Sequence, residues 1–184
     1  MAFQAALLDE ARQRGLFADE PCAFRFSRSA RDLAEALDDV LLAALEFAER
    51  ERCGARCAAP LAAVAVGGGA AVLLDRFLCH HEAGALAVYA GDVDGAALSA
   101  RATVFGGDAA AALFAGGAAA DVLHLGPAAG LAELAAALGG GVLAKGATAV
   151  VVDGGPDDPG RAFLARAACD ELRANGARSA WVCA

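Results

Sequence analysis

Short apolar runs, separated by glycines and acidic residues, dominate the chain from residue 60 onward. Six of these runs have the length and composition of strands, at residues 61–66, 86–90, 102–105, 121–125, 147–152 and 179–183. Stretches with helical spacing lie between them, at residues 70–78, 96–100, 109–115, 129–138 and 160–174. Runs this apolar are typical of parallel strands that are covered on both faces. The alternation therefore predicts an α/β fold with a doubly wound, mostly parallel sheet.

The first 57 residues differ from the rest, because they carry much of the charge and no strand-like run. We expect a short helix at residues 2–14 and a longer one from Ser29 to Arg52, where Ser29 and Asp32 form a capping pair. The longer helix has an apolar stripe at helical spacing, made of Leu33, Leu37, Val40, Leu41, Ala44, Leu45 and Ala48. We therefore predict two units: an N-terminal helical segment at residues 1–57, which caps a site or forms a partner surface, and a sheet domain at residues 58–184.

Composition excludes several classes of protein. The chain has 184 residues, a formal net charge of -8, 58% apolar residues and 21% charged residues. This is too apolar for a disordered chain and too acidic for a protein that binds nucleic acid through phosphate contacts. The uncharged run at residues 57–74 reaches the lower limit for a membrane span, but Pro60 and three glycines weaken it as a helix. We therefore expect no membrane span. Residues 1–15 carry charges in place of an apolar segment, so we also expect no signal peptide and a cytoplasmic location.

Six cysteines lie at irregular spacings along the chain. Without a secretory signal, we expect them to be free thiols in a reducing compartment. Five potential metal ligands (Cys53, Cys57, Cys79, His80 and His81) do not have the spacing of a zinc finger or ribbon. We therefore predict no metal site and place His80 and His81 in a polar turn.

Glycines and acidic residues follow the predicted strands in an informative order. Gly67, Gly68 and Gly69 follow the first strand, and a glycine turn before a helix lets an anionic ligand approach the backbone. Asp92 follows the second strand, where a carboxylate can accept hydrogen bonds from ribose hydroxyls, and Asp108 follows the third, where it can receive an adenine amino group. Together these residues predict a nucleoside-shaped site at the carboxyl ends of the strands.

This ordered series resembles the class I S-adenosylmethionine-dependent methyltransferases, which are Rossmann-like. Residues 63–71, Ala-Val-Ala-Val-Gly-Gly-Gly-Ala-Ala, are similar to the family's first motif, with Ala71 in place of the last glycine. Residues 89–101 resemble the second-strand motif, Gly107-Asp108-Ala109 the adenine-side acid, residues 120–123 the fourth strand and residues 142–152 the fifth. The resemblance covers about residues 61–153, half of the chain.

The resemblance implies S-adenosylmethionine as cofactor and a small molecule or protein side chain as methyl acceptor. Gly67, Gly68 and Gly69 would approach the methionine part, Asp92 the ribose, and Asp108 with Ala109 the adenine. The fourth strand ends in His124-Leu125-Gly126-Pro127 and not in Asn/Asp-Pro-Pro-Tyr, which argues against an adenine, cytosine or glutamine amino group as acceptor.

His124 is the candidate catalytic residue, because an imidazole at a strand end can take a proton from the acceptor. Its alternative role is a strand-end residue bound to a backbone group. Only one strand follows the last predicted helix, where the family has an antiparallel pair, so we expect a sheet truncated at its edge and leave a degenerate, non-catalytic protein open.

Two other functions stay open. A dinucleotide-dependent oxidoreductase would use Asp92 for the ribose of NAD, although the third glycine of its fingerprint is replaced by Val72. A non-enzymatic interaction subunit would bind a partner, or a second copy of the chain, through the helix from Ser29 to Arg52.

Overall fold

A computed structural model of the chain describes residues 28–53, 61–67, 70–80, 84–89, 98–99, 102–105, 120–126 and 149–183. The helices predicted at residues 2–14, 109–115 and 129–138 lie outside these residues. Only Leu98 and Ser99 of the helix predicted at residues 96–100 are described, and they are not helical.

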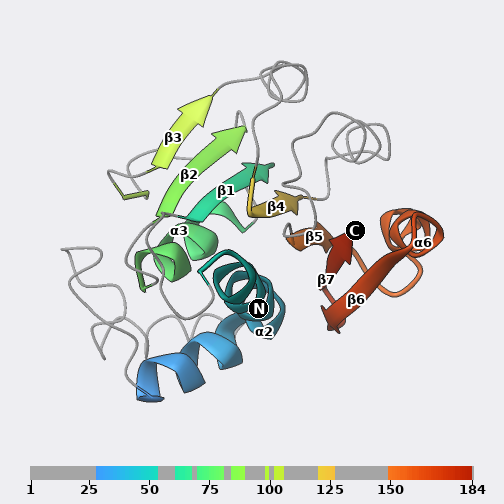
Figure 1. Cartoon of the computed structure of the whole chain (residues 1–184), viewed down its shortest axis with the longest axis horizontal. Helices are drawn as coiled ribbons and strands as arrows, with labels where there is room; N and C mark the ends of the chain where they lie inside the picture. Colours follow the sequence, from blue (N-terminus) through green and yellow to red (C-terminus); the bar gives the residue numbers. More distant parts are fainter. Residues whose placement is uncertain are drawn as a thin grey trace.

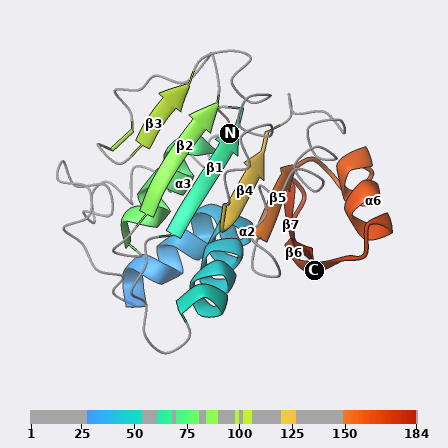
Figure 2. The ribbon, with the colours of Figure 1, turned by 45° about the horizontal axis from the view of Figure 1, so that its top comes forward.

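A seven-stranded sheet forms the centre of the molecule (Figures 1 and 2). Its strands follow the order β3-β2-β1-β4-β5-β7-β6. They are β1 (Leu61–Val66), β2 (Gly84–Tyr89), β3 (Ala102–Phe105), β4 (Val122–Leu125), β5 (Ala149–Asp153), β6 (Cys169–Ala174) and β7 (Arg178–Cys183). Strands β3, β2, β1, β4 and β5 are parallel, whereas β7 is antiparallel to both of its neighbours. The predicted doubly wound, mostly parallel α/β fold is confirmed, and all six predicted strands begin within two residues of the observed ones.

The C-terminal hairpin corrects the prediction of a truncated sheet. The helix predicted at residues 160–174 ends early, because α6 spans only Pro159–Arg166, and β6 follows from Cys169. Residues 169–174 are compatible with a helix by composition, but pairing with β7 makes them a strand, so tertiary structure overrides local propensity. Ala168, with φ of 58°, makes the turn between the helix and the strand. The sheet therefore ends in the antiparallel pair β7 and β6.

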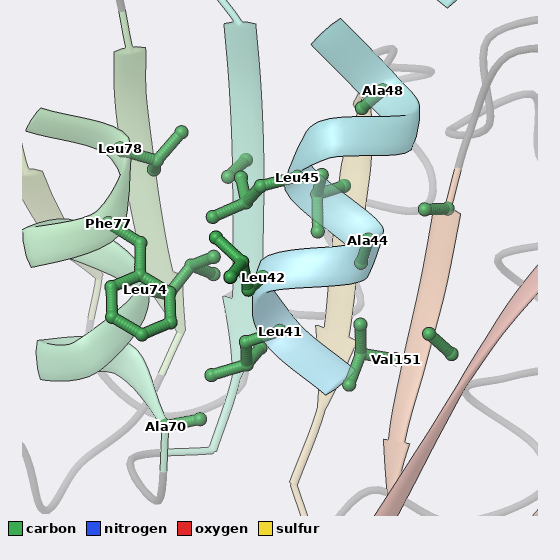
Figure 3. Close-up of a cluster of buried hydrophobic side chains, with 14 of the residues drawn as sticks. Leu41, Leu42, Ala44, Leu45, Ala48, Ala70, Leu74, Phe77, Leu78 and Val151 are labelled. Atoms are coloured by element: carbon green, nitrogen blue, oxygen red, sulfur yellow. The ribbon is translucent and has the colours of Figure 1, made fainter. Parts of the chain in front are cut away.

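In the described part of the chain, one face of the sheet is covered by the helices α2 (Arg28–Cys53) and α3 (Ala71–His80). In Figure 3, Leu41 and Leu45 of α2 lie beside Leu74 and Phe77 of α3, over the strands. The strands contribute small side chains to this cluster, Ala63 and Ala65 from β1, which lets the large helical side chains fill the space. The opposite face packs against α6 through Val64, Val66, Leu123, Leu125, Val150, Val152, Leu164 and Trp181.

Helix α2 is interrupted at Asp38, where φ is -161° and ψ is 91°. The Asp38 Oδ1 atom accepts a hydrogen bond from the Leu41 N–H at 2.9 Å, so Asp38 starts a second helix in the manner of an N-cap residue. The predicted apolar stripe is buried from Leu37 to Ala48 against the sheet and α3. The described part of residues 1–57 thus uses its apolar side in the core, and the division into two units stays a prediction.

Cys169 and Cys183 form a disulfide that joins β6 to β7. The expectation of free thiols is wrong for this pair, because the two residues pair directly across the antiparallel strands, with Cα atoms 4.3 Å apart. The sequence analysis did not predict β6, and therefore it did not predict this cysteine pair. The side chains of the other four cysteines lie outside the described residues, so free thiols stay a prediction for them. In the part of the chain that the structure describes, no helix is long and apolar enough to cross a membrane.

Candidate functional site

Four parallel strands end in register at one edge of the sheet. Val66 of β1 pairs with Tyr89 of β2 and with Leu125 of β4, and Tyr89 pairs with Phe105 of β3. Each of these residues is the last of its strand. The segments that follow the four strands therefore all begin at the same edge, where open α/β sheets bind their ligands.

Two glycines meet where β1 and β4 end. The Gly126 N–H donates to the Val66 carbonyl oxygen at 2.7 Å, and a Cβ on Gly67 would lie 3.4 Å from the Gly126 Cα. A Cβ on Gly126 would lie 3.1 Å from the Val66 carbonyl oxygen. Gly67 has φ of 88°, a conformation that favours glycine and that turns the chain from β1 toward α3. Gly67 and Gly126 thus bring the backbones that follow β1 and β4 into direct contact.

Most of the predicted cofactor residues lie outside the described part of the chain. These are Gly68, Gly69, Asp92, Asp108 and Ala109. The strands that precede them are described, and β2 and β3 each end three residues before the predicted acid, Asp92 or Asp108. Their roles stay predictions, supported by the common edge from which their segments start.

His124 lies in β4, one residue before the strand ends, and it is completely buried. Its Nε2 atom lies 3.0 Å from Oδ1 of Asp153, the last residue of β5. The partner of Nε2 is therefore the Asp153 carboxylate, and not a backbone group as in the alternative role for His124. The other ring nitrogen, Nδ1, is buried and has no hydrogen-bond partner among the described atoms.

Asp153 continues this contact into a chain of four side chains, which we call the buried charge chain. The same Asp153 Oδ1 lies 3.3 Å from Nε of Arg178, the first residue of β7. The Arg178 Nη1 atom lies 2.9 Å from Oδ2 of Asp38 in α2. The four side chains, His124, Asp153, Arg178 and Asp38, are 0%, 9%, 15% and 8% exposed. Together they join β4, β5, β7 and α2 at the carboxyl edge of the parallel strands.

Two adjacent acids of α2 have opposite electrostatic environments. Burial raises the pKa of Asp38 above its ordinary value, although Arg178 and the Leu41 N–H oppose that shift. Burial also acts on Asp39, but hydrogen bonds from Asn175 and Arg173 outweigh it and lower the pKa of Asp39. The Asn175 and Arg173 donors lie 2.9 Å and 2.7 Å from the Asp39 carboxylate. The β6–β7 hairpin is thus tied to α2 through both acids.

Sequence reasoning found His124 but missed its partners. Asp153 directly follows the strand predicted at residues 147–152 and precedes two glycines, a signal that could have singled it out. Asp38 and Arg178 gave no such signal, because each lies in a segment of ordinary helical or strand composition far from the other in sequence.

Among the described residues, no three His, Cys, Asp or Glu side chains lie close enough together to hold a metal ion. The side chains of Cys53, Cys57, Cys79, His80 and His81 lie outside those residues.

Comparison with known proteins supports the fold. No family model matches the sequence, and no curated protein matches it. Among solved structures, the MycE methyltransferase from the mycinamycin biosynthetic pathway, in complex with Mg and SAH, is similar with a TM-score of 0.52 and 10% identity, over 87% of this chain and 49% of MycE. A complex of MycE with Mg, SAH and mycinamycin VI is similar with a TM-score of 0.50 and 12% identity, over 67% of this chain and 41% of MycE. The chain thus spans less than half of the length of MycE.

A human structure gives a more even match. Human methyltransferase-like protein 13, in complex with SAH, is similar with a TM-score of 0.52 and 16% identity, over 78% of each chain. The likeness at these identities concerns the arrangement of helices and strands. The chain has the fold of the class I S-adenosylmethionine-dependent methyltransferases.

Proposed function

We propose that the chain is an S-adenosylmethionine-dependent methyltransferase that acts on a small molecule or a protein side chain. The observation that carries the proposal is the edge at which β1, β2, β3 and β4 end in register, where the backbones of Gly67 and Gly126 pack against each other. The similar structures of MycE and human methyltransferase-like protein 13 are complexes with SAH, the product that the cofactor leaves after methyl transfer.

The position of Gly67 agrees with the cofactor motif that the sequence resembles. A Cβ on Gly67 would touch the Gly126 backbone, and the φ of Gly67 is positive, so this turn favours glycine. We assign Gly67, Gly68 and Gly69 to the methionine part, Asp92 to the ribose hydroxyls, and Asp108 with Ala109 to the adenine. When bound, the cofactor supplies an electrophilic methyl group on a sulfonium.

His124 is proposed as the residue that takes the proton of a hydroxyl, thiol or amine acceptor. Its Nε2 atom is engaged by Asp153, so Nδ1 is the nitrogen left for this role. Because His124 is completely buried, a small acceptor reaches it more easily than a bulky protein surface does. A small molecule is therefore the favoured acceptor class.

Strand order argues against a dinucleotide-dependent oxidoreductase. The dinucleotide-binding fold has the order 3-2-1-4-5-6 with parallel strands, whereas here an antiparallel strand lies between β5 and β6. An interaction subunit that binds through α2 is also disfavoured, because the apolar stripe of α2 is buried in the core.

Calorimetric titration of SAH into the whole chain tests the proposal. We expect binding by the wild type and a loss of about 10–100-fold in Asp92→Ala, because hydrogen bonds to a charged group contribute about 1.5–3 kcal/mol. Asp94→Ala, which removes a nearby acid of the same segment, is the matched control and should bind like the wild type. Titration of NAD under the same conditions tests the oxidoreductase.

Each outcome of this titration decides a separate point. No SAH binding by the wild type would overturn the cofactor assignment, and binding of NAD alone would favour the oxidoreductase. Equal loss in Asp92→Ala and Asp94→Ala would leave the cofactor in place and refute the specific role of Asp92.

A further inference from the structure

The buried charge chain places a guanidinium between two carboxylates from different elements. Arg178 contacts Asp153 through Nε and Asp38 through Nη1, so the two contacts use different edges of its planar fork. A lysine presents a single ammonium and cannot reproduce this arrangement. Asp38 is itself fixed, because its other carboxylate oxygen accepts from the Leu41 N–H at the start of the second half of α2.

The contact between Asp153 and His124 sets which ring nitrogen carries the proton. An ionised carboxylate only accepts hydrogen bonds, and Asp153 Oδ1 also lies 3.3 Å from Nε of the Arg178 cation. The neighbouring His124 Nε2, 3.0 Å from the same oxygen, must therefore donate. In a neutral imidazole with its proton on Nε2, Nδ1 carries a lone pair and accepts.

The free Nδ1 is the second observation. It is buried, and it makes no hydrogen bond with any described atom. Buried polar atoms nearly always have a partner, so an unpaired one calls for an explanation. A donor group of a bound molecule would satisfy it, and a protic methyl acceptor is such a molecule.

We propose that Asp153, Arg178 and Asp38 are positioning residues that hold His124 as the Nε2–H tautomer with an unprotonated Nδ1 ready to accept a proton. This inference rests on the proposed function in one respect, namely that the proton comes from a methyl acceptor. As the carbon–sulfur bond breaks and the methyl group joins the acceptor atom, that atom loses its proton to the Nδ1 lone pair. Nε2–H then remains bound to Asp153, which faces the charged imidazolium.

The charged groups around His124 are known for the described residues. They are Asp153 of β5, Arg178 of β7 and Asp38 of α2. Arg173 and Asp39 form a separate ion pair between the same hairpin and the same helix. This second pair supplies a matched control, because breaking it perturbs the same two elements without touching the buried charge chain.

Nitrogen NMR of histidine-labelled protein, recorded without cofactor or acceptor, tests the inference. The chain has three histidines, so His124→Gln assigns the His124 signals. In the wild type we expect a proton on Nε2 and a pyridine-like Nδ1. Asp153→Asn should shift the proton toward Nδ1, because the asparagine amide can turn its N–H toward Nε2. Arg178→Lys should shift it partly, and Arg173→Gln should leave the wild-type signals unchanged.

The outcomes separate this inference from the proposed function. A wild-type His124 with its proton on Nδ1 would overturn the inference even if every variant failed to fold. A wild-type spectrum in a folded Asp153→Asn, or the same change in Arg173→Gln as in Asp153→Asn, would also overturn it. A failure to bind SAH, with the expected tautomer present, would instead overturn the methyltransferase and leave the positioning role intact.

Discussion

Replacing Arg178 by methionine removes the cation between two buried carboxylates and keeps an unbranched apolar stem in its place. Asp38 and Asp153 are 8% and 9% exposed, so water can replace little of the lost interaction. Removing one partner of a buried ion pair typically costs about 3–5 kcal/mol. Because each carboxylate keeps one hydrogen bond, from the Leu41 N–H or from His124, we expect the low end, a loss of about 3 kcal/mol in the free energy of unfolding at neutral pH.

This loss should depend on pH in a defined direction. The pKa of Asp38 is raised in the folded protein by burial, so the folded state binds its proton more tightly than the unfolded state. The contribution of Asp38 to stability therefore falls as pH rises from its unfolded value of 3.8 through its folded pKa. Arg178 opposes this rise in pKa, so Arg178→Met raises the pKa further and enlarges the penalty. The stability deficit of Arg178→Met relative to the wild type should be small at about pH 4 and should grow toward about pH 8.

Urea unfolding followed by the fluorescence of Trp181, the single tryptophan, measures this deficit. We expect Asp38→Asn combined with Arg178→Met to recover part of the loss at about pH 8, since the carboxylate that needed the cation is gone. Arg173→Met, in the exposed ion pair of the same hairpin, is the control. A deficit that is equal at low and high pH, or a double variant no more stable than Arg178→Met, would refute the reasoning.

Three further predictions concern the rest of the fold. A Cβ on Gly154 would lie 2.4 Å from Asp158 Cγ, so Gly154→Ala should displace the N-cap of α6 and lower the free energy of unfolding in urea by about 2 kcal/mol. Asp158→Ala alone should cost about 1 kcal/mol, and the double variant should lose less than the sum of the two. Phe77 is fully buried between α2, α3 and the sheet, so Phe77→Ala should cost about 3–5 kcal/mol and shift the urea midpoint without changing the slope. Hydrogen bonds from the β6–β7 hairpin lower the pKa of Asp39 against the effect of burial. The contribution of Asp39 to the free energy of unfolding is therefore present above about pH 4 and is lost as pH falls through the folded pKa. At that low pH, Asp39→Asn and the wild type should have the same stability in urea unfolding.

The strands could be predicted from sequence because their signal is local. Leu61–Val66 is apolar throughout and ends at a glycine, and the structure buries nearly all of it between two helical layers. The order of strands is a different matter. It depends on which backbones pair across long stretches of chain, and nothing in an apolar run of six residues identifies its neighbour.

The errors at both ends of the described chain have the same origin. Cys169–Ala174 has the composition of a helix and becomes a strand because β7 lies beside it. Asp38 lies in a stretch with helical spacing, yet its carboxylate caps a new helix and faces Arg178. In each case a contact outside the segment decides the structure: the adjacent strand β7 for Cys169–Ala174, and Arg178, far along the chain, for Asp38.

The antiparallel direction of β7 explains why the site could only be half predicted. Asp153 ends β5, and it pairs in register with Arg178, which begins β7. If β7 ran parallel to β5, its first residue would lie at the opposite edge of the sheet, about 13 Å away for a strand of five residues. The reversal thus brings a cation to the edge where β1, β2, β3 and β4 also end. The hairpin therefore adds Arg178 to the candidate site. The pattern of glycines and aspartates after the parallel strands could not indicate this residue, because Arg178 lies in an antiparallel strand.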